Sequence, residues 1–170
     1  MTSELIPLNK VFKIERGNKF DLNKMSRCAP SEQAVVFIGR TGERNGFVAF
    51  VEKLDATEPF ESGLITVALG GSALSSFVQP RPFYTAQNID VLRPLVTMSL
   101  DTKLYYALCI EANRFRYSTF GREANRTLRH LLTPPPECVP SWVEGATVAA
   151  VEELCRDMNG LVAAGEDANP

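Results

Sequence analysis

Long hydrophobic runs are missing from this chain of 170 residues. Its longest apolar segments, such as residues 34–38, have the length of a strand and fall far short of the roughly 20 apolar residues that a membrane-spanning helix needs. The first residues, Met1-Thr2-Ser3-Glu4, do not combine a basic start with an apolar block, as a signal peptide would. We therefore expect a cytoplasmic protein that does not enter a membrane.

Paired metal ligands are also missing. The only histidine is His130, and the four cysteines (Cys28, Cys109, Cys138 and Cys155) are widely separated and form no C-x-x-C pair. Zinc sites normally need Cys and His ligands at short, paired spacing. We therefore expect no metal site, and unpaired thiols fit the reducing cytoplasm.

The motifs of several enzyme classes are absent as well. Gly70-Gly71-Ser72 lacks the following lysine of a phosphate-binding loop, and we interpret it as a turn. A serine or cysteine triad needs a positioned histidine, whereas His130 lies within a leucine-rich segment. Residues 134–137, Pro-Pro-Pro-Glu, lack the leading Asn or Asp and the aromatic residue of an amino-methyltransferase loop, and no glycine-rich cofactor strand occurs. These absences predict a chain that is not an enzyme and binds no cofactor, S-adenosylmethionine included.

One nuclease-like pattern has to be weighed against this prediction. Asp90 followed by Asp101-Thr102-Lys103 imitates the arrangement of two acids and a lysine that holds Mg²⁺ in many restriction nucleases. That arrangement needs the second acid on a strand facing the first. Asp101 instead falls where a helix is expected to begin, and the helix dipole accounts for an acid there. A small Mg²⁺-dependent nuclease is therefore the least favoured alternative.

Strand patterns fill the first 94 residues. Alternating or short apolar runs bounded by turn residues predict six strands, at residues 11–14, 34–38, 47–51, 63–68, 76–79 and 88–92. Pro80 and Pro82 end the fifth of these strands or hold it at a sheet edge. Residues 22–26 are expected to form a short helix capped by Asp21.

Helical spacing replaces this pattern from residue 99 on. Ser99 is the expected N-cap of a helix that runs to about Phe115, and a second helix or turn is expected over residues 124–131. The proline-rich residues 134–140 form an extended linker to a last helix over residues 143–158. Strands followed by helices predict an α+β domain, with a twisted, largely antiparallel sheet, a helix packed after the strands and a short C-terminal helix.

The formal net charge of −2 hides a strong asymmetry. Residues 137–170 carry seven acidic side chains and one basic one, a charge of −6 that leaves +4 for residues 1–136. Five arginines lie within 16 residues and are opposed only by Glu123: Arg114, Arg116, Arg122, Arg126 and Arg129. This distribution predicts a basic face and an acidic tail, although a solvated helix face would have the same composition. We divide the chain into a domain at residues 1–136 and a linker, helix and acidic tail at residues 137–170.

Five short segments follow one another in the order seen in a known family. They are a hairpin with Arg and Asn-Gly, an Ile-Thr-Val strand with a Gly-Ser turn, a Phe-Tyr…Asn-Ile segment, a Tyr-Ser…Gly-Arg loop and a proline-containing exit, at residues 36–46, 63–72, 83–92, 117–122 and 132–136. Together they resemble the target recognition domain of restriction-modification specificity subunits, which occurs in type I systems and related type II enzymes. The resemblance covers roughly residues 10–142.

This resemblance implies a role in bacterial defence. Such a domain binds double-stranded DNA in the major groove, does no chemistry itself, and brings a methyltransferase, and often an endonuclease subunit, to one half of a bipartite target. Full specificity subunits carry two such domains separated by long helices, whereas this chain has one domain and a short final helix. Either two copies pair as a homodimer, or the chain is a fragment, or it is the reading module of another protein. We expect the apolar stripe of the final helix, together with Trp142, to pack on its own domain.

The resemblance and the charge pattern identify the residues expected to contact DNA. Loop residues are the candidates for reading bases, since arginine suits guanine and a side-chain amide suits adenine: Arg40, Thr41, Arg44, Asn45, Tyr84, Thr85 and Gln87. The five clustered arginines are the candidates for phosphate contacts, with Asn18 and Lys19 as weaker ones. The alternative is a protein-interaction or decoy module that docks on a methyltransferase without selecting DNA.

Overall fold

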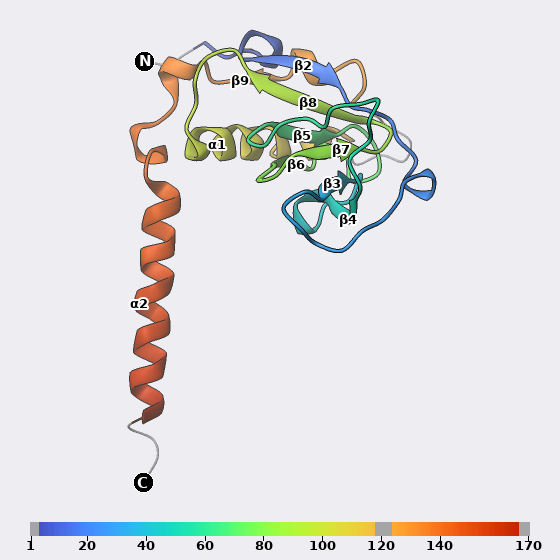
Figure 1. Cartoon of the computed structure of the whole chain (residues 1–170). Coiled ribbons are helices and arrows are strands. Elements are labelled where there is room, and N and C mark those ends of the chain that lie inside the picture. The colour runs from blue at the N-terminus through green and yellow to red at the C-terminus, as the bar shows by residue number, and fades with distance from the viewer. Residues whose placement is uncertain (1–3, 118–123, 167–170) are drawn as a thin grey trace.

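The computed structural model of the chain describes residues 4–117 and 124–166, with side chains as far as residue 158. One sheet has four strands, in the order β2 (Phe12–Arg16), β8 (Ile89–Pro94), β5 (Ile65–Ala68) and β6 (Ser76–Val78). A second sheet has three strands, in the order β4 (Phe47–Val51), β3 (Val35–Ile38) and β7 (Phe83–Thr85). A short pair joins β1 (Ile6–Pro7) to β9 (Leu132–Thr133). The α-helices of the described residues are α1 (Leu100–Glu111) and α2 (Ala146–Glu166) (Figure 1).

Strand direction agrees with the sequence-based prediction. Among the described residues, every strand pair is antiparallel except β3 with β7, which run parallel with Phe37 opposite Tyr84. The α+β class with a largely antiparallel sheet is therefore confirmed, and the six predicted strands are present with ends moved by at most two residues. Strand β7 was not predicted. The sequence analysis placed Tyr84 and Thr85 in a loop after Pro82, and that assignment is wrong.

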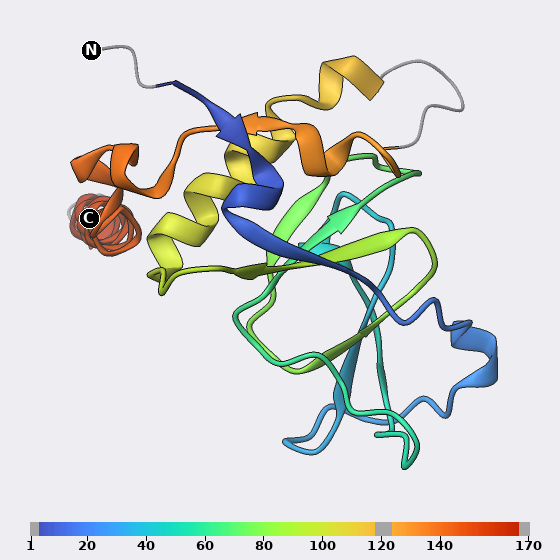
Figure 2. The same ribbon diagram turned by 90° about the horizontal axis from the view of Figure 1, so that it is seen from above.

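The four-stranded sheet packs on both of its faces. Ile65, Val67 and Leu92 face a core that Tyr106 and Ile110 of α1 complete. The other face of the sheet contributes to a second core, shared with the three-stranded sheet. Seen from above, the β1–β9 pair lies over α1 (Figure 2). Burial of this apolar surface on both sides of one sheet is the main source of stability for a domain of this size.

Apolar side chains cover both faces of the three-stranded sheet as well. This explains why the sequence of β3 is an uninterrupted apolar run. Val36 belongs to the core between the sheets. Val35 and Phe37 point the other way into a third core, which Tyr84 and apolar residues of the loop at residues 20–25 complete. Both faces of β3, the central strand of this sheet, are therefore buried.

Helix α1 begins as predicted and ends earlier. The Ser99 hydroxyl accepts a hydrogen bond from the Thr102 N–H at 3.1 Å, which confirms the predicted N-cap. The helix ends at Glu111, four residues before the predicted end at Phe115. A 3₁₀ turn, η4 (Arg114–Tyr117), follows it.

Two further helical predictions are met only by short 3₁₀ turns. The helix predicted after Asp21 is η2 (Leu22–Lys24), whose first turn is capped by a hydrogen bond from the Asn23 N–H to the Asp21 carboxylate at 3.0 Å. Of the helix or turn predicted over residues 124–131, the structure forms η5 (Leu128–His130).

Helix α2 leaves the domain and extends away from it (Figure 1). It starts three residues later and ends eight residues later than predicted. Its apolar stripe is exposed, at 61% for Val148, 55% for Val151 and 59% for Leu154. The expectation that this stripe packs on its own domain is therefore wrong. Trp142 is itself largely exposed and meets only the edge of Tyr105, with ring centroids 6.3 Å apart. No helix of the described residues is long and apolar enough to span a bilayer.

Two carboxylates fasten the start of α2 to the start of α1. Asp101, in the first turn of α1, accepts hydrogen bonds from the Gly145 N–H at 2.8 Å, the Thr147 N–H at 3.3 Å and the Thr147 hydroxyl. Glu144 in turn accepts two hydrogen bonds at 2.7 Å, from the hydroxyls of Ser99 and Thr102. Each helix thus receives a carboxylate at its N-terminus, where the helix dipole favours negative charge. We term this arrangement the carboxylate clasp, and it fixes the direction of α2 relative to α1.

The buried phenol of Tyr84 yields a prediction about stability. The side chain is fully buried, and its hydroxyl donates to the Thr57 carbonyl at 2.6 Å and accepts from the Leu54 N–H at 3.1 Å. Tyr84→Phe leaves both backbone groups without this partner, which should lower the free energy of unfolding by about 2 kcal/mol, measured by urea denaturation. Tyr117→Phe removes a single hydrogen bond, between exposed hydroxyls of Tyr117 and Thr127, so it is the comparison variant and should lower the free energy of unfolding by less, about 0.5 kcal/mol. Equal stability of Tyr84→Phe and the wild type would contradict this role.

The carboxylate clasp yields a prediction about pH. The hydrogen bond from the Thr147 side chain, followed by those from the backbone of Gly145 and Thr147, holds the pKa of Asp101 below its ordinary value. A lowered pKa means that the clasp stabilises the attachment of α2 fully above the ordinary value, near pH 4, and that this contribution is lost as the pH falls through the lowered value. Circular dichroism at 222 nm between pH 6 and 2.5 should show this loss of helix in the wild type and not in Asp101→Asn. Superimposable pH profiles of the two proteins would rule the clasp out as the cause.

Candidate nucleic-acid interface

One edge of the domain gathers chain segments from both sheets. β8 begins there while β2 and β5 end there, because β8 pairs antiparallel with both, and Arg16 lies opposite Asp90. The parallel strands β3 and β7 also end at this edge, where the Ala86 N–H donates to the Ile38 carbonyl at 2.9 Å. We term this region the loop edge, and it consists of residues 16–20, 39–46, 69–75, 86–88, 114–117 and 124–130.

One backbone and one side-chain hydrogen bond hold the two C-terminal segments of the loop edge in place. The Ala124 N–H donates to the carbonyl of Leu69, just after β5, at 2.8 Å. The hydroxyls of Tyr117 and Thr127 share a hydrogen bond, which joins η4 to the segment that leads into η5. Arg114 lines a shallow hollow beside the β5–β6 turn, together with Gly71, Ala73, Phe115 and Tyr117. Arg114 therefore lies beside the same turn that contacts Arg40.

The hairpin between β3 and β4 is bent sharply and anchored to the other sheet. Arg44, Asn45 and Gly46 all have positive φ, at 48°, 59° and 76°, a conformation that costs a non-glycine residue about 1 kcal/mol or more. The Asn45 side-chain amide donates to the Val78 carbonyl at 3.1 Å, and the Gln79 amide donates to the Asn45 carbonyl at 3.0 Å. These bonds keep the bend in place and occupy the Asn45 amide, which the sequence had suggested as an adenine reader.

The β5–β6 turn supports the base of this hairpin. The Ser72 N–H donates to the Arg40 carbonyl at 3.2 Å. Gly71 has a φ of +71°, and a side chain there would press against Arg40 at 3.3 Å, so glycine permits this close approach. Arg40 itself is exposed, while Thr41 is half-buried and its hydroxyl accepts a hydrogen bond from the Glu43 N–H at 3.2 Å. The hairpin thus presents the side chains of Arg40, Glu43 and Arg44, while the side chains of Thr41 and Asn45 bond to backbone groups.

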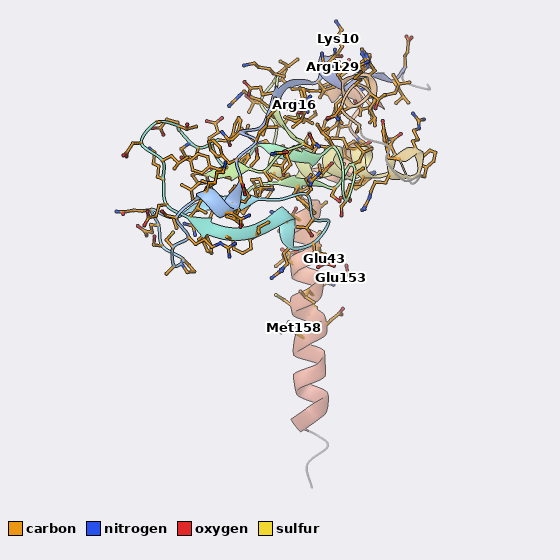
Figure 3. All side chains as sticks on the ribbon, turned by 90° about the vertical axis from the view of Figure 1, so that its right-hand side faces the viewer. Lys10, Arg16, Glu43, Arg129, Glu153 and Met158 are labelled. Atoms are coloured by element: carbon orange, nitrogen blue, oxygen red, sulfur yellow. The ribbon has the colours of Figure 1, made fainter. Side chains whose placement is uncertain are left out.

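A second group of cations surrounds Asp90. The Arg16 Nη1 atom lies 3.3 Å from the Asp90 Oδ1 atom and donates to the Asn125 side-chain oxygen at 3.2 Å. Burial raises the pKa of Asp90, while the charges of Arg16, Arg129 and Lys19 act in the opposite direction. Figure 3 shows Arg16 and Arg129 near the top of the domain, with Glu43 of the hairpin at its lower side. Arg16 was not predicted from sequence, although an arginine directly before the Gly17-Asn18 turn was a usable signal.

Most of the predicted DNA-contacting residues lie on the loop edge and are accessible. Eight have exposed side chains in the described part of the chain: Arg40, Arg44, Asn45, Gln87, Arg114, Arg116, Arg126 and Arg129. Thr41 is half-buried, and Arg122 lies outside the described residues. The Arg116 guanidinium stacks over the Phe115 ring, 5.6 Å from its centroid.

Two predicted base readers are in the core instead. Tyr84 and Thr85 of β7 are both 0% exposed. The Tyr84 hydroxyl is bound to the backbone near β4, and the Thr85 hydroxyl accepts from the Asn18 N–H at 2.8 Å. Side chains without exposed surface cannot reach a base edge, so the prediction that Tyr84 and Thr85 read bases is wrong. Asn18 bonds to the Thr85 N–H at 3.1 Å and is likewise used for structure.

Charge pairing differs between the two ends of the sheets. At the end opposite the loop edge, Arg93 pairs with Glu15 and Glu61, and Lys53 pairs with Glu58 at 2.8 Å. The ion pairs found within residues 4–117 and 124–158 include none made by five exposed arginines of the loop edge: Arg40, Arg44, Arg114, Arg126 and Arg129. The loop edge therefore keeps a positive field, which attracts polyanions.

The acids of the nuclease-like pattern do not form a site. Asp90 is the second residue of β8 at the loop edge, whereas Asp101 follows the other end of that strand and is bound in the carboxylate clasp. Within the part of the chain that the structure describes, no group of three or more His, Cys, Asp and Glu side chains is arranged to hold a metal ion.

The fold is similar to that of solved specificity subunits. The S subunit of a type I restriction-modification system from M. genitalium is 13% identical, with a TM-score of 0.53 over 76% of this chain and 33% of that one. A chain from a structure of type I R-M complex assembly is 16% identical, with a TM-score of 0.55 over 96% of this chain and 41% of that one. The HsdS subunit from Thermoanaerobacter tengcongensis is 16% identical, with a TM-score of 0.52 over 95% and 39%. This chain thus spans about two fifths or less of the length of these subunits.

The family comparison covers most of the sequence. No curated protein matches the chain. Residues 2–129 match the model of the type I restriction modification DNA specificity domain, a span that includes both sheets, α1 and all of the loop edge up to Arg129. The chain therefore belongs to the family of type I restriction modification DNA specificity domains.

Proposed function

We propose that this chain binds double-stranded DNA through the loop edge, selects a short base sequence there, and directs the methyltransferase of a restriction-modification system, with its endonuclease subunit, to that site. The observation that carries the proposal is the convergence of exposed arginines from separate segments on one edge, where no described acid pairs with Arg40, Arg114 or Arg126. Affinity for DNA comes largely from neutralised phosphates, and unpaired arginines supply that neutralisation.

The two parts of the loop edge suit different contacts. Arg114, Arg126 and Arg129 lie on the segments that pack over the sheet ends, and we assign them to phosphates. Arg40 and Arg44 lie on the anchored hairpin, and Gln87 lies in the β7–β8 connection beside it. Arginine reads guanine and glutamine reads adenine by paired hydrogen bonds. These three residues are therefore the base readers that we propose.

The chain carries out no chemistry in this proposal. The carboxylate of Asp101, the acid that a nuclease would need, accepts the hydrogen bonds of the carboxylate clasp instead. The cysteines of the described residues are free, which fits the reducing compartment in which chromosomal DNA is found in bacteria. We place the activity in the cytoplasm on that ground.

We further propose that α2 pairs with the same helix of a second copy of this chain. Val148, Val151, Cys155 and Met158 follow one another at spacings of three and four, as in a helix that pairs with another helix. Met158 is 57% exposed, and Val148 and Val151 are exposed to a similar degree. This face of α2 therefore packs against nothing in a single described chain. The chain corresponds to 41% of one matched solved chain, so two copies approach the length of one such subunit. A homodimer would present two loop edges to one duplex.

Selection from random duplex DNA, followed by titration of variants, tests DNA binding. We expect the wild type to enrich a short half-site. Arg126→Ala with Arg129→Ala should weaken binding on the order of tenfold at 0.1 M salt and reduce the slope of log K against log salt by about 2, because each phosphate contact contributes about 0.9 to that slope.

Arg93→Ala is the matched control, because it removes an arginine that is paired with Glu15 and Glu61 at the opposite end of the sheets. It should leave affinity and salt slope unchanged. Equal behaviour of the two proteins, or a wild type that enriches no sequence, would contradict the proposal. Retention of a methyltransferase partner without enrichment would instead favour the decoy alternative.

Leu154→Glu tests the pairing of α2. Leu154 lies next to Val151 and Met158 on the same side of the helix, so a charge there should reduce the dimer association constant more than tenfold in sedimentation experiments, since burial of a leucine contributes about 1.5–3 kcal/mol per side chain. Ala149→Glu, on the opposite face of the helix, should leave dimerisation unchanged, and circular dichroism should show equal helix content in both variants. A wild type that stays monomeric at about 100 µM (roughly 5.5 kcal/mol of association) would refute pairing between copies and leave another helix as the occupant of the stripe.

A further inference from the structure

Among the described residues, Asp90 is the most deeply buried acid beside the proposed DNA-binding surface. It is 5% exposed and lies directly opposite Arg16 in the β2–β8 pair. Its Oδ1 atom lies within ion-pair distance of Arg16 but receives no hydrogen bond, because the guanidinium N–H is not directed at it. A buried carboxylate with an unused acceptor is costly. Its location at the loop edge therefore calls for an explanation other than stability.

The charged groups of the described residues that act on the Asp90 carboxylate are all cationic. Arg16 touches it, and the charges of Arg129 and Lys19 act on it from η5 and from the turn after β2. The side-chain oxygen of Asn125 accepts a hydrogen bond from the same Nη1 atom of Arg16 at 3.2 Å. Arg16 is thereby held between two oxygen atoms, although its side chain is 40% exposed. An exposed arginine restrained at two points presents its remaining N–H groups in one direction.

The negative charge beneath these cations also affects how the loop edge meets DNA. Binding to arbitrary sequences is driven by phosphate neutralisation and grows with the net positive charge of the surface. Selective binding requires donors held in a fixed position relative to the base edges. A buried carboxylate under Arg16 lowers the net positive charge of the surface and so weakens binding to arbitrary sequences. The same carboxylate restrains Arg16 and so supports selective binding.

We propose that Asp90 is a positioning residue that holds Arg16 at the loop edge and weakens binding to arbitrary DNA, so that recognition becomes more selective at the expense of affinity. The inference rests on the proposed DNA-binding function and adds Arg16 to the residues that contact the duplex. Arg16 is restrained by Asp90 and Asn125 before DNA arrives, and it donates to the duplex from that orientation.

Asp90→Asn keeps the shape of the side chain and removes its charge. We expect affinity for random duplex to rise about threefold to tenfold at low salt and the salt slope to steepen by about 1, because one more cationic charge is available to phosphates. Affinity for the selected target should rise less, so the ratio of the two affinities should fall. A residue needed only for folding would lower both affinities together, and it would not steepen the salt slope.

A double-mutant cycle shows whether Asp90 acts through Arg16. In an Arg16→Ala background, Asp90→Asn should no longer change the ratio of target to random affinity. Arg16→Lys keeps the charge but loses the planar fork, so it should preserve the salt slope and still reduce the ratio. This last variant carries the test even if asparagine at position 90 prevents folding.

Each outcome separates this inference from the proposed function. If the wild type binds DNA and the Arg126 and Arg129 variant weakens it, while Asp90→Asn and Arg16→Lys leave both affinities unchanged, the inference is overturned and the function is supported. A parallel fall of both affinities in Asp90→Asn, with a lower melting temperature and an unchanged ratio in Arg16→Lys, also overturns it. If the wild type shows no salt-dependent binding at all, the proposed function fails first.

Discussion

The position of β8 between β2 and β5 is the constraint on which the rest of the molecule depends. Because β8 is antiparallel to both neighbours, its first residues lie beside the last residues of two other strands. The same register places Arg16 against Asp90 and brings the β5–β6 turn beside the hairpin between β3 and β4. Apolar side chains on both faces of this strand, such as Val91 and Leu92, lock the register, since a shift by one residue would exchange the two faces. The arrangement of the loop edge therefore follows from how the core packs.

The distribution of charge follows from that geometry rather than from composition. The net charge of −2 gives no hint of a polyanion-binding surface. At one end of the sheets the cations are held in ion pairs, as Arg93 is with Glu15 and Glu61. At the other end, exposed arginines surround a single buried acid, Asp90. Surface ion pairs contribute little to stability, so their main effect here is to confine the unpaired positive charge to one edge.

Sequence patterns predicted the local structure well and the long-range structure only in part. Alternation and turn residues located six strands, and Ser99 was recognisable as a cap, because these signals are contained within a few neighbouring residues. Strand β7 was missed because three residues after Pro82 carry no measurable period, and its parallel pairing with β3 depends on distant chain. The burial of Tyr84 and Thr85 follows from that pairing and was invisible for the same reason.

The candidate site shows the same division. The clustered arginines and the hairpin were evident as residue types in loops, while Arg16 was passed over because its strand was expected to end at residue 14. The burial of Asp90 among cations required the register of β2 on β8, which no local pattern encodes. The apolar stripe of α2 could be recognised from its spacing, but its exposure could not, because the separation of α2 from the domain depends on the contact between Asp101 and Gly145.

The carboxylate clasp has a mechanical consequence. α2 is 21 residues long, a lever of roughly 31 Å at 1.5 Å per residue. A change of about 10° at its base would displace its far end by roughly 5 Å, more than the 3.4 Å rise between neighbouring base pairs. A small change of angle at the two short side chains that hold the base of α2 would therefore move anything fastened to its tip by more than one base-pair step.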